Sequence, residues 1–138
     1  MSENGDILLF ESEDGEVNIE VHLSDDTVWL TLDRMAELFQ RDKSVVSRHI
    51  KNVIDSGELQ ENSVVANYAT TASDGKTYQV NYFSLDMVIS VGYRVNSYRG
   101  VQFRIWATKA LKEYMIKGFV MDDERLSGRK NNYFDELY

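Results

Sequence analysis

The sequence predicts an α+β fold with winged-helix character: a helix-turn-helix, a small antiparallel sheet, a hairpin wing and C-terminal helices. Three observations lead to this prediction. Two short amphipathic patterns with helical spacing adjoin within residues 31–59, and two Asp-Gly turns each join β-prone segments. Apolar residues then recur at three-to-four spacing within residues 84–118. Because 43% of the 138 residues are hydrophobic, we expect one compact domain around a single core.

The first thirty residues are expected to form a small antiparallel sheet. Residues 7–10 are an apolar run, and the Asp-Gly pair that follows is a strong hairpin signal. Residues 17–23 alternate between apolar and polar side chains, and residues 27–30 supply a third strand. His22 falls on the polar side of its strand, where the pattern assigns it no chemistry.

Residues 31–59 predict a pair of short helices. Thr31 can cap the first helix, and the break falls at residues 40–42. Asp42 or Ser44 can cap the second helix, and Gly57 ends it. The outer face of this second helix carries hydroxyl groups and cations, which suits contact with base edges and phosphates: Ser44, Ser47, Arg48 and Lys51. An ordinary amphipathic surface pair would show the same pattern, so that interpretation stays open.

A second hairpin is predicted where residues 64–71 and 77–83 flank an Asp-Gly turn. A hairpin directly after a helix-turn-helix occupies the position of a wing. Lys76 at its tip would then reach a phosphate. The other interpretation is a hairpin that only closes the sheet.

Two further helices are expected near the C-terminus. Ser84 can cap the first, which should end near Gly92, and Ser97 can cap a longer one that should end at Gly118. Between them, Arg94 and Arg99 lie in a tyrosine-rich segment. These arginines either form a phosphate-binding corner at a helix N-terminus or pair with the surplus carboxylates of the chain.

The net charge of -8 is unevenly distributed. Residues 1–26 carry nine acidic side chains and no Lys or Arg, whereas residues 41–53 carry four cations against one acid, Asp42. Residues 88–118 carry six cations against one acid. Local binding of phosphates is therefore compatible with the acidic total, although long-range attraction to nucleic acid should be weak.

Several classes of function are disfavoured by composition. The chain has no Cys, only two His, and no carboxylates at a metal-binding spacing, so we expect no enzyme, no metal and no cofactor. No long apolar run suggests a membrane span, and residues 1–6 lack the basic start of a signal peptide. We expect a cytoplasmic protein that does not bind membranes.

Several blocks resemble, in the same order, the RhuM family of bacterial proteins, named for a virulence-associated member: residues 27–31, 35–39, 73–78, 90–95, 103–108, 117–119 and 122–126. The resemblance extends over roughly residues 6–137, and the chain is more distantly similar to Bro-N and KilA-N type domains. It implies a DNA-binding domain over residues 1–121. Residues 122–138 would be a charged tail that opens a further helical region in the longer family members. The resemblance supplies no catalytic residues.

We therefore expect sequence-selective binding of duplex DNA, in the role of a regulator or target-recognition module of a mobile-element, virulence or defence locus. The face of the second helix would contact bases and phosphates, and Arg41, Lys43 and Lys76 would contact the DNA backbone. Arg94 and Arg99 are further candidate DNA-binding residues, through the phosphate-binding corner. A homodimer is also expected, because one module offers few contacts. The first alternative is a protein-interaction or antitoxin-like module that holds a basic partner on its acidic N-terminal sheet. A nucleic-acid-processing enzyme is a weaker alternative.

Overall fold

The computed structural model describes residues 6–121, which form an α+β fold around one five-stranded antiparallel sheet. The expected α+β class is therefore confirmed. The charged tail expected at residues 122–138 lies outside the described residues. The strands and helices follow the chain in this order: β1 (Asp6–Glu11), β2 (Asn18–Ser24), β3 (Thr27–Thr31), α1 (Leu32–Phe39), α2 (Lys43–Asp55), α3 (Glu61–Val64), β4 (Val65–Thr71), β5 (Thr77–Ser84), α4 (Leu85–Arg94) and α5 (Tyr98–Met121).

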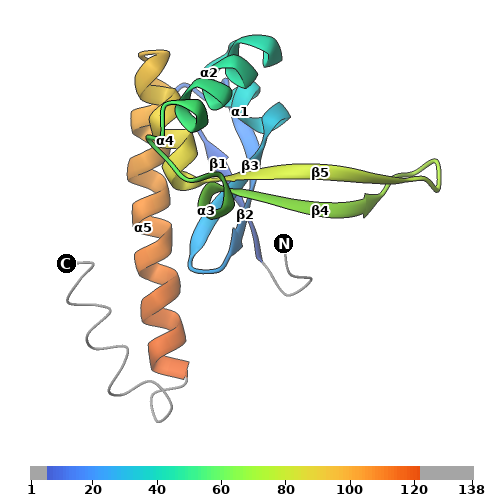
Figure 1. Cartoon of the computed structure of the whole chain (residues 1–138). Coiled ribbons are helices and arrows are strands. Elements are labelled where there is room, and N and C mark those ends of the chain that lie inside the picture. Colours follow the sequence, from blue (N-terminus) through green and yellow to red (C-terminus); the bar gives the residue numbers. More distant parts are fainter. Residues whose placement is uncertain (1–5, 122–138) are drawn as a thin grey trace.

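The sheet has the strand order β1-β2-β3-β5-β4. Figure 1 shows α1, α2 and α4 gathered at one end of the sheet and α5 along one side of the molecule. Strands β4 and β5 extend away from the rest of the fold on the side opposite α5. This arrangement leaves β1 at one edge of the sheet and the β4–β5 hairpin at the other.

The first predicted hairpin is present, with β1 and β2 paired so that Phe10 lies opposite Ile19. Gly15 adopts φ +73° in the connecting loop, a left-handed conformation that favours glycine. The predicted alternation is also confirmed, because Ile19, Val21 and Leu23 are buried. His22, between them, is half-buried and meets the Tyr82 ring edge-on at a centroid distance of 4.9 Å.

The helix pair predicted over residues 31–59 is present as α1 and α2. Thr31 Oγ1 accepts a hydrogen bond from the backbone N–H of Arg34 at 3.3 Å, which confirms the predicted cap. Gln40 ends α1 in a left-handed conformation with φ 52°. Asp42 occupies the N-cap position of α2, but its carboxylate makes no capping bond and instead accepts from Ser44 Oγ at 2.8 Å.

The first of the last two helices ends close to the predicted position, whereas the stop predicted at Gly118 for the second is wrong. Helix α4 continues past Gly92 to Arg94, and α5 continues past Gly118 to Met121. A single glycine costs a helix interior only about 1 kcal/mol, so it stops a helix only where packing and capping agree. Gly92 serves a different purpose, because its Cα lies 3.4 Å from where a Cβ on Gly100 would stand, at the contact between α4 and α5.

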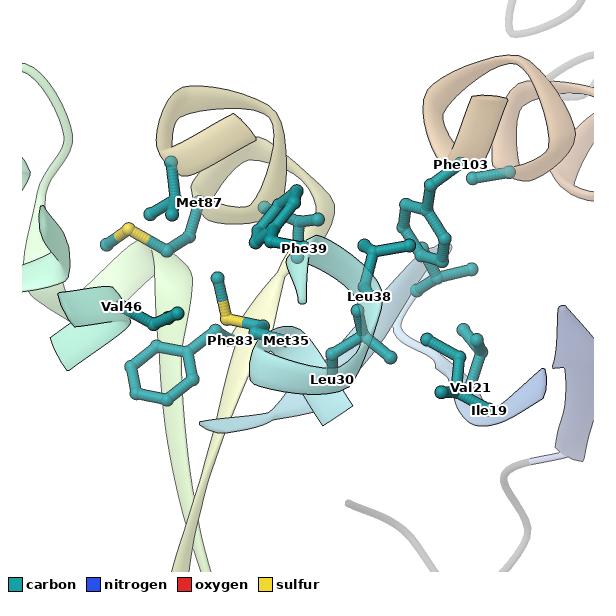
Figure 2. Close-up of a cluster of buried hydrophobic side chains, with 14 of the residues drawn as sticks. Ile19, Val21, Leu30, Met35, Leu38, Phe39, Val46, Phe83, Met87 and Phe103 are labelled. Carbon is teal, nitrogen blue, oxygen red and sulfur yellow. The ribbon is translucent and has the colours of Figure 1, made fainter. Parts of the chain in front are cut away.

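The core lies between one face of the sheet and the helices. In Figure 2, side chains from α1, α4 and α5 point toward apolar side chains of the sheet. Phe103 of α5 is fully buried and meets Phe10 of β1 edge-on at 5.3 Å between ring centroids. Buried side chains from every strand except β4, and from all five helices, contribute to one continuous cluster. This packing holds α2 and the hairpin in place relative to each other.

Candidate nucleic-acid interface

Helix α2 presents the polar face that its sequence predicts. Val46, Ile50 and Val53 are buried against the core, whereas the predicted contact residues are exposed to solvent: Ser44, Ser47, Arg48 and Lys51. The helical spacing of three, four and seven therefore places two hydroxyl groups and two cations along one open line.

Two cations of this region are held by carboxylates on the surface. Lys43 Nζ lies 3.1 Å from Asp33, and Lys51 Nζ lies 2.6 Å from Asp55. The hydrogen bond to Asp55 raises the pKa of the Lys51 ammonium group. All four side chains are more than half exposed, and such pairs contribute only about 0.2–1 kcal/mol. A phosphate can therefore compete for either lysine.

Arg48 differs from these lysines because it is exposed and forms no ion pair with any residue between 6 and 121. Its guanidinium is free to contact a planar acceptor. Arg41, at the turn between α1 and α2, donates through Nη1 to the carbonyl oxygens of Phe39 and Gln40, both at 3.3 Å. These bonds leave its other donors available.

Lys76 lies at the tip of the β4–β5 hairpin, as predicted, and is exposed. The carboxylate of Asp74 shapes this tip by accepting from the Lys76 backbone N–H at 2.9 Å and from the Tyr78 hydroxyl at 2.7 Å. The first of these hydrogen bonds is the main cause of the lowered pKa of Asp74. The Lys76 ammonium group has no ion-pair partner within the described part of the chain.

Arg94 and Arg99 both pair with carboxylates, the second of the two interpretations that the sequence left open. Arg94 donates to Glu58 at 2.9 Å. Arg99 donates to Asp14 at 2.9 Å and to Glu16 at 2.7 Å. It also donates to Gln40 Oε1 at 2.8 Å, so this guanidinium joins the β1–β2 loop to the end of α1.

The hairpin adds polar side chains that sequence reasoning did not single out. Asn67 and Asn81 lie opposite each other in the β4–β5 register, and their amides share a hydrogen bond of 2.7 Å. Asn81 and Ser47 line two shallow hollows, about 370 and 280 Å³ in volume, between the hairpin and α2. Gln79 lines the larger one.

The strand alternation could have identified these amides. Gln79 and Asn81 are separated by one residue, so both face the α2 side of the hairpin together with Phe83. Tyr78, Val80 and Tyr82 occupy the intervening positions. The α2 side of β5 therefore carries two uncharged polar side chains next to the buried ring of Phe83, whereas the opposite side carries Tyr78 and Tyr82.

Residues 6–121 contain no group of three or more His, Cys, Asp or Glu side chains that could hold a metal ion. In the same part of the chain, no helix combines the length and apolar character that crossing a membrane requires.

Comparison with known proteins gives one match. Residues 63–138, more than half of the chain, match the model of the Virulence protein RhuM family. The matched segment begins just before β4 and therefore includes the hairpin, α4 and α5. No curated protein and no solved structure matches the chain.

Proposed function

The chain belongs to the virulence protein RhuM family, and we propose that it binds duplex DNA sequence-selectively as a winged helix. In this proposal α2 enters the major groove and the β4–β5 hairpin acts as the wing. The biological role would be that of a regulator or target-recognition module of a mobile-element, virulence or defence locus.

The observation that carries this proposal is the shared polar surface of α2 and the hairpin. Thirteen residues give α2 a length of about 20 Å, and the major groove is wide enough to admit such a helix. The hairpin extends away from the body beside it (Figure 1). Because Ser47 and Asn81 line the same hollows, a duplex lying along α2 would also meet the base of the hairpin.

Each side chain has a distinct role in the proposed complex. Arg48, exposed and without an ion pair in the described structure, would make a bidentate contact to guanine, and Ser44 and Ser47 would contact neighbouring bases or phosphates. Lys51 would exchange Asp55 for a phosphate. The remaining backbone contacts are assigned to Arg41, Lys43 and Lys76.

Arg94 and Arg99 are assigned a structural role instead. Arg94 Nη2 is engaged by Glu58, and both terminal nitrogens of Arg99 are engaged by the Asp14, Glu16 and Gln40 side chains. A phosphate would have to displace these partners. We also propose a homodimer on DNA, because one α2 helix and one hairpin offer few base contacts and paired half-sites supply the rest.

The test measures duplex binding by fluorescence anisotropy at about 50 and 200 mM salt, where phosphate contacts reveal themselves through salt dependence. The probes are fragments from upstream of the gene and a randomised duplex pool. Arg48→Ala should weaken binding to the tightest-binding upstream fragment by about 1–3 kcal/mol. Lys51→Ala should mainly reduce, by about one, the slope of the logarithm of the binding constant against the logarithm of salt concentration.

The matched control is Arg104→Ala. Arg104 is also an exposed arginine, but it lies on α5, away from the proposed interface. It should leave binding unchanged. Equal binding by the wild type and the Arg48 variant would overturn the assignment of α2 as the recognition helix. Absence of DNA binding at both salt concentrations would favour the alternative function, a protein-interaction module. That alternative is supported by the acidic N-terminal sheet, which could hold a basic partner.

A further inference from the structure

The sheet edge formed by β1 lies opposite the hairpin edge in the strand order and has an unusual surface. Alternate side chains of β1 point to opposite faces. Leu8 and Phe10 pack against the core, whereas Ile7 and Leu9 are 57% and 64% exposed. Two large aliphatic side chains therefore stand next to each other on an open face at the edge of the sheet.

The backbone of β1 is also available. Within residues 6–121, β1 pairs only with β2, so the backbone groups on its other side have no partner strand. Natural proteins usually protect such an edge with lysine, proline, a bulge or a covering loop. The six residues of β1, DILLFE, include neither lysine nor proline. An unprotected edge with exposed aliphatic side chains is a template for one more strand.

Charge indicates what kind of strand fits. Residues 6–26 contain no Lys or Arg. Arg99 neutralises Asp14 and Glu16, but six further carboxylates have no ion pair within the described residues: Asp6, Glu11, Glu13, Glu20, Asp25 and Asp26. In the β1–β2 register Glu20 lies opposite Leu9, so the aliphatic pair is directly bordered by negative charge.

We propose that β1 is a docking edge for a basic strand of a partner protein. The partner strand would extend the sheet through backbone hydrogen bonds. Its aliphatic side chains would cover Ile7 and Leu9, and its Lys or Arg side chains would meet Glu11 and Glu20.

A second copy of this chain fits the edge poorly. Antiparallel pairing of two β1 strands would bring Asp6 of one copy toward Glu11 of the other at both ends, and like charges across strands are destabilising. The docking edge is also separate from the proposed DNA-binding surface. The hairpin and β1 occupy opposite edges of the sheet, so both can be engaged at once.

The test uses the full chain and a short synthetic peptide in which valine and lysine take turns on one face of the strand, with threonine at the intervening positions. Valine and lysine can then face the side of the sheet that carries Ile7, Leu9, Glu11 and Glu20. Binding is measured by isothermal titration calorimetry. Two control peptides separate the contribution of charge to binding from the contribution of backbone hydrogen bonds. One carries glutamate in place of lysine, and the other is N-methylated on alternate amides, which keeps its charge but removes the donors that a strand needs. Both should bind at least about tenfold more weakly than the parent peptide.

Two protein variants locate the site. Leu9→Lys places a cation on the docking edge and should weaken binding of the parent peptide at least about tenfold. Ile105→Lys is the matched control, because Ile105 is 61% exposed on α5, well matched to Leu9 in exposure. It should leave peptide binding unchanged. Circular dichroism and DNA binding by the Leu9 variant report separately on its fold and on the proposed function.

Three results would overturn the proposal. Equal binding of the N-methylated peptide would show attraction by charge alone, and equal loss in the Ile105 variant would place the peptide elsewhere. A concentration-dependent dimer abolished by Leu9→Lys in sedimentation experiments would show that a second copy occupies the edge.

Discussion

Gly92 lies at a contact where one added methyl group has a calculable effect. A Cβ at this position would stand 3.2 Å from Cε1 of Phe39 and 3.5 Å from the Cα of Gly100. The ring of Phe39 is 1% exposed, and a Cβ on Gly100 would approach the same ring atom, also at 3.2 Å. The ring therefore cannot move away from one glycine without meeting the other or its buried neighbours.

Two opposing terms determine the stability of Gly92→Ala. Replacing glycine by alanine inside a helix contributes about 1 kcal/mol in favour of folding. Overpacking a dense core typically costs about 1–3 kcal/mol. Because Phe39 is confined on both sides, we expect the second term to prevail, with a net loss of about 1 kcal/mol. That loss corresponds to a urea midpoint lower by about 0.5 M.

The assay is equilibrium urea denaturation followed by circular dichroism. Phe39→Leu provides the control background, because the smaller side chain relieves the contact. In that background Gly92→Ala should become neutral or stabilising, with a coupling of about 1–2 kcal/mol between the two sites. A higher midpoint for Gly92→Ala in the wild-type background would refute the reasoning, since it would mean that the Phe39 ring yields without cost. The same effect in both backgrounds would refute it as well.

Two further predictions concern charge. Asp55→Asn frees Lys51 from its 2.6 Å ion pair, so if α2 binds DNA we expect about two- to fivefold tighter duplex binding at about 50 mM salt and a smaller gain at about 200 mM. Unchanged affinity at both concentrations would contradict this role of the pair. Partial burial lowers the pKa of His22 from 6.5, which means that the unfolded chain takes up a proton more readily than the folded protein. Stability should therefore rise with pH in the interval below 6.5 and level off above it, and His22→Gln should flatten that rise in urea midpoints measured between about pH 5 and 8.

The elements that the sequence predicted well are those with strong local signals. Thr31 caps α1, the alternating pattern of β2 is buried on one side, and both Asp-Gly turns join paired strands. The short helix α3 was not predicted, because four residues are too few to show a helical period.

The candidate site was predictable in part. The exposed face of α2 follows from helical spacing, and Arg48 and Lys51 are on it. The contribution of Asn81 from the hairpin was missed, although the alternation in β5 contained the signal. The ion pairs of Lys43 and Lys51 with Asp33 and Asp55 were also missed, because one-dimensional spacing does not show which surface charges meet.

Local patterns were enough to predict the α+β class, the two hairpins, the helix pair and the uneven distribution of charge, since these depend on neighbouring residues in the chain. The packing of Gly92 and Gly100 against Phe39 is visible only in three dimensions, whereas the sequence indicated only that a helix ends near Gly92. Only the tertiary structure decided that Arg99 reaches Asp14, 85 residues away in the chain, instead of remaining open to a phosphate. Such contacts arise from how whole elements pack, and local patterns carry no record of which distant side chains that packing brings together.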